Sequence, residues 1–217
     1  SVLNCINEVT KNIPIEQLSS IGITNQRETT IAWSKSTGKP LHNALVWQDT
    51  RTQDICDELK QINDLHDEFS RTGLPVATYF SLSKILWLLR NVDEVQIAKS
   101  NNDLCFGTVD SWLLYKLTGN HVTDVTNASR TLLMDLKTLN WIEKILDKLD
   151  IPKESLPTIM PSMCNFGTNE ELLSNVPITA VLGDQQASLF GQNCISSGDV
   201  KNTYGTGCFA LTNTGTD

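Results

Sequence analysis

The stretch VLGDQQASLFGQ, residues 181–192, places a carboxylate at the point where an apolar run ends. Residues 177–182 form a short hydrophobic segment typical of a strand inside a parallel sheet. The following residues, 185–190, favour the start of a helix. Asp184 therefore lies between a predicted strand and a predicted helix. Ligands of open α/β sheets bind at that edge, which makes Asp184 a candidate site residue. A helix cap is the alternative, because Asp is also preferred there.

Strand and helix patterns alternate along the rest of the chain, which predicts an α/β fold. Residues 20–24 predict a strand, and 29–34 with 41–47 predict a hairpin. Apolar residues at helical spacing predict helices over 2–9, 52–69, 81–92 and 141–151, and 104–119 predict a strand followed by a helix that Gly119 ends. Residues 152–176, rich in proline, predict an irregular connection.

Composition excludes several classes of protein. The chain has 217 residues, 40% of them hydrophobic, and a net charge of -8, with its 17 basic residues scattered. Nucleic-acid and membrane-surface binders need a basic footprint, so neither is expected. No stretch approaches the roughly 20 apolar residues of a membrane span, and no secretion signal is evident, which favours a cytoplasmic protein. The six cysteines show no paired spacing and indicate reduced core residues, and the three histidines are dispersed, so no metal site is expected.

Two charged residues follow the predicted strand at 20–24. In TNQRETT, residues 24–30, Arg27 and Glu28 are adjacent. Neighbouring side chains of an extended chain point to opposite faces, so a simple ion pair between these two is not expected. An exposed turn with two solvated charges is one interpretation. If the chain bends there, both side chains could converge on a polyhydroxylated ligand.

The segment VKNTYGTGCFALTNTG, residues 200–215, contains a Gly-Thr-Gly turn. A dinucleotide fingerprint would require a helix after the second glycine, but CFALTN alternates like a strand, so a hairpin is predicted instead. Backbone N–H groups and a threonine hydroxyl in such a turn can hold a phosphate. An ordinary tight turn is the alternative.

Seven segments, in the same order, resemble the FGGY family of carbohydrate kinases: GITNQRETT, NALVWQDTRT, TYFS, FGTVDSWL, VTDVTNASRT, GDQQASLFGQ and KNTYGTGCF. The resemblance runs from about residue 20 to the end and is highly specific. It implies an actin-like, ribonuclease-H-like pair of domains with ATP and substrate in the cleft between them. Residues 1–193 would be the later part of the N-terminal domain, and 194–217 would begin the C-terminal domain with its phosphate-binding hairpin.

The resemblance also implies a function, the phosphorylation of glycerol by ATP with Mg²⁺. It makes Asp184 the general base and assigns Gly205, Thr206 and Gly207 to the ATP phosphates. The implied glycerol pocket contains Arg27, Glu28, Trp47, Tyr79, Asp184 and Phe209, with Gln185 beside it.

Some properties stay open. The start and the adenine-binding half expected of the family are missing, so this chain is expected to be an inactive fragment of an active kinase. Another polyol or sugar kinase of the family and a non-catalytic ligand-binding derivative are the alternatives. The sequence does not decide the oligomeric state, a homo-oligomer included.

Overall fold

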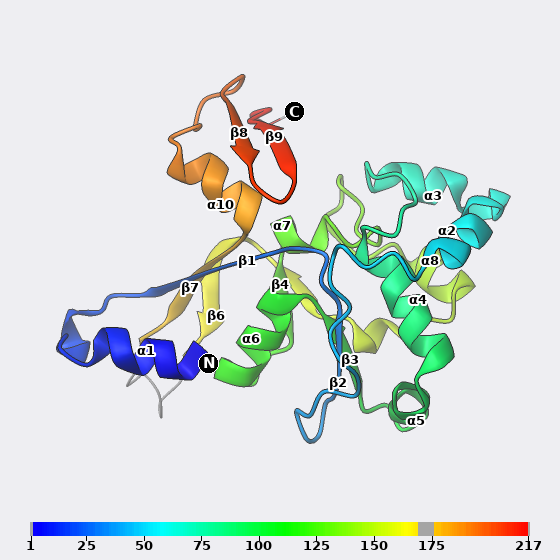
Figure 1. Cartoon of the computed structure of the whole chain (residues 1–217), viewed down its shortest axis with the longest axis horizontal. Helices are drawn as coiled ribbons and strands as arrows, with labels where there is room; N and C mark the ends of the chain where they lie inside the picture. The colour runs from blue at the N-terminus through cyan, green and yellow to red at the C-terminus, as the bar shows by residue number, and fades with distance from the viewer. Residues whose placement is uncertain (1, 169–175, 217) are drawn as a thin grey trace.

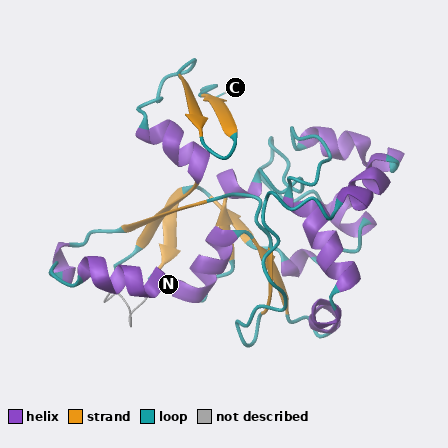
Figure 2. Cartoon of the chain, in the orientation of Figure 1, coloured by secondary structure: helices purple, strands orange, loops and turns teal. Residues whose placement is uncertain are grey.

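A computed structural model of the chain describes residues 2–168 and 176–216. A sheet extends to the left of the view, most helices gather on the right, and a hairpin stands at the top (Figure 1). Helices and strands alternate along the chain (Figure 2), which confirms the predicted α/β class.

The sheet on the left decides where the site forms. Strand β1 (Ile21–Asn25) pairs in parallel with β7 (Ile178–Gly183), and β6 (Met163–Gly167) pairs antiparallel with β7. The register sets Asn25 beside Gly183, so β1 and β7 end at the same edge. Helix α10 (Asp184–Gly191) begins at that edge. Parallel pairing therefore brings the residues after β1 next to the start of α10.

Three further strand pairs lie in the described residues. They are β2 (Ile31–Ser34) with β3 (Leu104–Gly107), antiparallel; β4 (Val122–Asp124) with β5 (Thr158–Met160), parallel; and β8 (Val200–Tyr204) with β9 (Cys208–Thr212), antiparallel. The last pair is the hairpin at the top of Figure 1, with residues 205–207 as its turn. The predicted hairpin around the Gly-Thr-Gly turn is therefore confirmed.

The largest apolar core lies among the helices on the right. These are α2 (Gln53–Lys60), α3 (His66–Arg71), α4 (Ser81–Asn91), α5 (Asp93–Ser100) and α8 (Glu143–Lys148), with short 3₁₀ turns η2 (Asn63–Leu65) and η3 (Lys153–Ser155). Leu65, Leu82 and Ile145 are completely buried in this core. A second contact centres on Trp33 of β2, which packs against Trp112 of α6 (Val109–Thr118) at a ring distance of 5.3 Å.

Helix α7 (Val125–Ala128) lies at the sheet edge where β1 and β7 end. Asp124 caps it by accepting hydrogen bonds from the backbone N–H groups of Thr126 and Asn127, at 2.9 and 3.0 Å. The Asn127 and Asn25 side chains exchange hydrogen bonds of 2.9 and 3.2 Å. The Thr126 hydroxyl accepts from the N–H of Gly183 at 2.8 Å. The ends of β1 and β7 are therefore both tied to α7.

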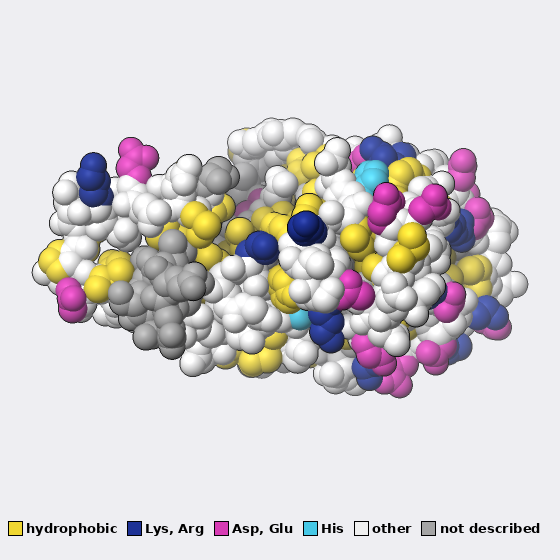
Figure 3. Space-filling model, turned by 90° about the horizontal axis from the view of Figure 1, so that it is seen from below, with side chains coloured by type: hydrophobic (Ala, Val, Ile, Leu, Met, Phe, Trp, Pro, Cys, Tyr) yellow, Lys and Arg dark blue, Asp and Glu magenta, His cyan; other side chains and the backbone are white. Residues whose placement is uncertain are grey.

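The surface seen from below carries acidic and basic side chains side by side over the helical half of the molecule, without a single basic patch on that face (Figure 3). Among the described residues, no helix combines the length and apolar character needed to cross a bilayer.

Two predicted elements are divided or displaced. The predicted helix over 52–69 breaks after Lys60 and resumes at Asn63, because Asn63 and Asp64 favour turns over helix interiors. Residues 41–47 do not form a regular strand. Thr30, just before β2, forms an isolated bridge with Leu45, and the Leu41 N–H donates to the Ala32 carbonyl at 2.9 Å, whereas β2 pairs regularly with β3.

Other regions are more regular or differently buried than predicted. The connection over 152–176 was wrongly predicted as irregular: it contains β5 and β6, and Pro161 lies between the strands rather than preventing them. Its residues 169–175 lie outside the described part of the chain.

Helix α5 was not predicted. Helix α1 (Val2–Thr10) forms as predicted but buries no residue, and 3₁₀ turn η1 (Ile15–Gln17) follows it. Cys5 and Cys208 are exposed, so not every cysteine is a core residue.

Candidate active site

A left-handed residue three positions after β1 lets two adjacent charged side chains line the same cavity. Glu28 has φ of 63°, and its carbonyl accepts hydrogen bonds from the hydroxyls of Thr30 and Ser81 at 3.1 and 3.2 Å. This conformation is uncommon for a residue other than glycine and marks a bend held by its surroundings. Arg27 and Glu28 are only 5% and 1% exposed. The interpretation of this segment as a turn with solvated charges is therefore wrong.

Arg27 reaches across to α10. Its Nε lies 3.2 Å from Asp184 Oδ1, outside good hydrogen-bond geometry, and an NH group donates to Gln186 Oε1 at 3.3 Å. A Cβ on Gly183 would lie 2.6 Å from Arg27 Cδ, which is too close for any real contact. Because Gly183 has no side chain, the Arg27 side chain can pass over the end of β7.

Glu28 pairs with a different cation. Arg130 Nε donates to Glu28 Oε1 at 2.8 Å. Burial raises the pKa of Glu28, and the hydrogen bond from Arg130 opposes that rise. The Arg130 guanidinium also lies over the Phe80 ring at 5.0 Å and the Tyr79 ring at 5.8 Å. Arg130 therefore contacts and stabilises both Glu28 and Tyr79 of the site.

Three aromatic rings face this charged group. Trp47 lies edge-on to Tyr79 at a ring distance of 5.6 Å and to Phe209 of β9 at 6.5 Å. The Arg27 guanidinium is 5.9 Å from the Phe209 ring. Burial raises the pKa of Tyr79, so its phenol stays neutral at physiological pH and can donate a hydrogen bond. The rings supply apolar surface with polar edges.

Asp184 is the first residue of α10, and its side chain is 44% exposed. The N-cap is Gly183, without a side-chain cap bond, so the alternative interpretation of Asp184 as the helix cap is wrong. Asp184 Oδ1 accepts from the backbone N–H of Gln185 at 2.9 Å, and Oδ2 lies 3.4 Å from Gln185 Nε2. The carboxylate is thus held locally while it stays accessible.

The turn of the β8–β9 hairpin lies opposite. The Gly205 N–H donates to the Gly207 carbonyl at 3.1 Å, and Thr206 at the tip is exposed. A Cβ on Gly207 would lie 2.7 Å from the Phe209 ring, whereas one on Gly205 would meet only an ordinary contact at 3.8 Å. Gly207 therefore makes room for the aromatic ring that faces Trp47.

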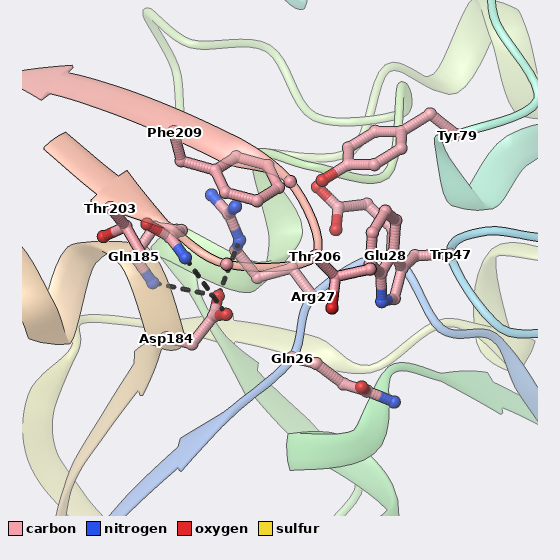
Figure 4. Close-up of a pocket in the computed structure, with 12 residues that line it drawn as sticks. Gln26, Arg27, Glu28, Trp47, Tyr79, Asp184, Gln185, Thr203, Thr206 and Phe209 are labelled. Atoms are coloured by element: carbon pink, nitrogen blue, oxygen red, sulfur yellow. Dashed lines mark hydrogen bonds and ion pairs between the residues drawn. The ribbon is translucent and has the colours of Figure 1, made fainter.

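These elements enclose one cavity of about 230 Å³ (Figure 4). The structure brings all ten sequence-predicted site residues to its lining: Arg27, Glu28, Trp47, Tyr79, Asp184, Gln185, Gly205, Thr206, Gly207 and Phe209. Four of them, Arg27, Glu28, Trp47 and Tyr79, form what we call the inner wall. The other six, on α10 and the hairpin, form the outer wall.

Sequence reasoning missed several residues of the site. Gln26 and Thr203 also line the cavity, and Gln186, Arg130 and Lys201 contact lining residues. Arg130 lies within the quoted segment VTDVTNASRT, and Lys201 within KNTYGTGCF, but neither had an assigned role. Their partners lie far away in the sequence, so no local pattern signals them. Among residues 2–168 and 176–216, no group of three or more His, Cys, Asp or Glu is placed to hold a metal ion.

Known proteins are similar in sequence to this chain. The model of the N-terminal domain of the FGGY family of carbohydrate kinases matches residues 1–191. This chain belongs to that family. Glycerol kinase of Roseiflexus sp. (strain RS-1) is 50% identical over 204 residues, which are 92% of this chain and 41% of the relative. Glycerol kinase 2 of Streptomyces avermitilis is 53% identical over 206 residues, 92% of this chain and 40% of the relative. The chain spans about two-fifths of the length of these curated relatives.

Solved structures of FGGY kinases share the fold. The crystal structure of Plasmodium falciparum glycerol kinase with ADP superposes with a TM-score of 0.91 at 42% identity, covering 99% of this chain and 44% of that one. Gluconate kinase from Lactobacillus acidophilus gives a TM-score of 0.82 at 26% identity, covering 95% of this chain and 42% of that one. The predicted actin-like kinase fold is therefore confirmed.

Proposed function

We propose that the complete protein transfers the γ-phosphoryl group of ATP to glycerol, giving glycerol 3-phosphate. The observation that carries this proposal is the cavity of about 230 Å³ with charged groups on one side and aromatic rings on the other. Glycerol offers three hydroxyls on a short carbon chain, so its site needs directed donors and acceptors beside an apolar surface. The identity of about 50% with glycerol kinases supports the same substrate.

In this proposal Arg27 and Glu28 hold two hydroxyls of glycerol, and Trp47, Tyr79 and Phe209 pack against its carbon chain. Asp184, with Gln185 beside it, faces the terminal hydroxyl that reacts. A new bond joins that oxygen to the γ-phosphorus, the bond from the γ-phosphorus to the bridging oxygen of ADP breaks, and the proton passes to Asp184. Phosphoryl transfer proceeds through a loose transition state, so positioning matters more than a strong base.

The outer wall would meet ATP. Gly205, Thr206 and Gly207 form a turn whose N–H groups and hydroxyl suit phosphate oxygens. Mg²⁺ would arrive with the nucleotide, because such ions keep substrate phosphates and few protein carboxylates as ligands. The ion supplies charge neutralisation on the phosphates.

The domain boundary belongs to the same proposal. Residues 1–193 form the later part of the N-terminal domain, and 194–217 begin the C-terminal domain. We assign activity to the complete protein. A cytoplasmic location is the remaining part of the proposal, and cell fractionation tests it.

A substrate panel on the complete protein tests the function. With ATP and Mg²⁺ present, we expect turnover with glycerol to exceed turnover with xylulose and gluconate by at least about 100-fold in kcat/KM, because a longer carbon chain cannot place its hydroxyls on the same donors and acceptors. Preference for xylulose or gluconate would assign the protein to another branch of the family. Glycerol binding without turnover would instead support a non-catalytic derivative.

A further inference from the structure

A buried lysine joins the hairpin to the helix that carries Asp184. Lys201 lies on β8 and is only 6% exposed. Its ammonium donates to Gln185 Oε1 in a short hydrogen bond and to Thr203 Oγ1 at 2.7 Å. None of the ion pairs formed by the described residues includes Lys201. Its contacts are therefore two neutral oxygens, one on its own strand and one on α10.

Burial of an ammonium group without a carboxylate partner is unfavourable. Burial lowers the pKa of Lys201, and the negative charge of Asp184 opposes that effect. An apolar side chain of similar length would avoid the desolvation cost at this position. The charge therefore calls for an explanation in what it contacts.

The hydrogen bond from Lys201 determines the orientation of the Gln185 side-chain amide. A lysine ammonium has only donors, so the group that faces it must be the amide oxygen. The amide nitrogen is then left to face Asp184, and Gln185 Nε2 lies 3.4 Å from Asp184 Oδ2. In the reverse orientation two oxygens would oppose each other beside Asp184. Lys201 thus sets the orientation of the group that neighbours the carboxylate.

We propose that Lys201 is a positioning residue for phosphoryl transfer, which fixes the Gln185 amide and so ties the position of Asp184 to the hairpin that carries the Gly-Thr-Gly turn. This inference rests on the proposed function. Lys201 would then connect the residue that faces the reacting hydroxyl with the hairpin that holds the phosphate, and so align the two reacting groups. Gln185 and Asp184 belong to the proposed first domain and Lys201 to the second.

The proposal predicts a split between binding and rate. In Lys201→Met the Gln185 amide is free to turn and Asp184 loses its alignment. We expect kcat to fall about 10- to 100-fold, since small misplacements of reacting groups carry costs of that size. The KM for glycerol should change less than about threefold, because the inner wall is intact. Lys201→Arg keeps the charge and the donors and should recover part of the rate.

The experiment measures kcat, both KM values and thermal midpoints for the complete protein and its variants. Lys39→Met, at an exposed lysine, is the matched control. Lys201→Gln repeats the test if Lys201→Met does not fold. A double-mutant cycle with Gln185→Leu should show that the second change adds little to the first, because Lys201 acts through Gln185.

Wild-type turnover separates the two proposals. An inactive wild-type protein would overturn the proposed function and this inference with it. An active wild type whose Lys201 variants match Lys39→Met would overturn only the inference. Additive effects in the cycle, or a loss confined to the KM for ATP, would also overturn it, because they would place Lys201 in phosphate binding.

Discussion

The two walls of the pocket differ in how the rest of the chain holds them. Arg27 and Glu28 of the inner wall are almost completely buried, and Glu28 is fixed by contacts from Ser81 and Arg130. On the outer wall, Asp184 is 44% exposed, and Gly205 and Thr206 are exposed at a hairpin tip. The difference teaches that the two charged residues proposed to hold glycerol are buried, whereas the proposed proton acceptor and the proposed phosphate-binding turn are more exposed.

The largest effect should come from the outer wall, at Asp184. Asp184→Asn keeps size and polarity but removes the proton acceptor, so kcat should fall about 10²- to 10⁴-fold, the usual contribution of a general base. Glycerol binding, measured by calorimetry on the complete protein, should change little because the inner wall remains. Unchanged turnover would remove the role assigned to Asp184.

A smaller effect should follow where the walls touch. Gly183→Ala places a Cβ 2.6 Å from Arg27 Cδ and must displace that side chain. Overpacking of this kind costs about 1–3 kcal/mol, and we expect the KM for glycerol to rise about tenfold. Gly22→Ala is the control, because its Cβ would lie 4.0 Å from its nearest neighbour. Equal KM values in the two variants would show that Arg27 does not bind glycerol.

Within the hairpin, two glycines should respond differently. Gly207→Ala collides with the Phe209 ring at 2.7 Å, so the ring must move away from Trp47. We expect the KM for glycerol to rise about three- to fivefold, on the order of 1 kcal/mol. Gly205→Ala meets no close atom and should keep the wild-type value for glycerol. The reverse order of the two variants in steady-state kinetics would contradict the placement of Phe209.

The remaining prediction concerns stability, through the support of the inner wall. Lys84 is completely buried, donates to the carbonyls of Thr78, Tyr79 and Phe80, and has its pKa lowered by burial from 10.5 to about 8. Between these values the unfolded chain binds more protons, so this group adds stability as the pH rises.

We therefore expect the stability difference between wild type and Lys84→Met to shift in favour of wild type from pH 7.5 to 9.5, by on the order of 1–2 kcal/mol. Thermal midpoints of both proteins at the two pH values measure this shift. A difference that stays constant would show that Lys84 keeps its proton throughout.

The sequence predicted local elements better than long-range contacts. The strand and helix around Asp184, the hairpin at 200–212 and the stop at Gly119 follow from short patterns that the structure confirms. The list of pocket residues came from resemblance, because no periodicity reports that residues 27 and 184 adjoin. Positive φ at Glu28 and the missing Cβ at Gly183 serve tertiary contacts. Arg130 and Lys201 were missed for the same reason, since their partners are set by folding.

The central claim is that the two walls close around one glycerol with its terminal hydroxyl against Asp184. A crystal structure of the complete protein with glycerol tests it most directly. The account predicts a hydroxyl oxygen within hydrogen-bond distance of the Asp184 carboxylate, about 2.5–3.0 Å, with Arg27 and Glu28 on the remaining hydroxyls. Glycerol bound outside this pocket, or held in it with no hydroxyl near Asp184, would contradict the account.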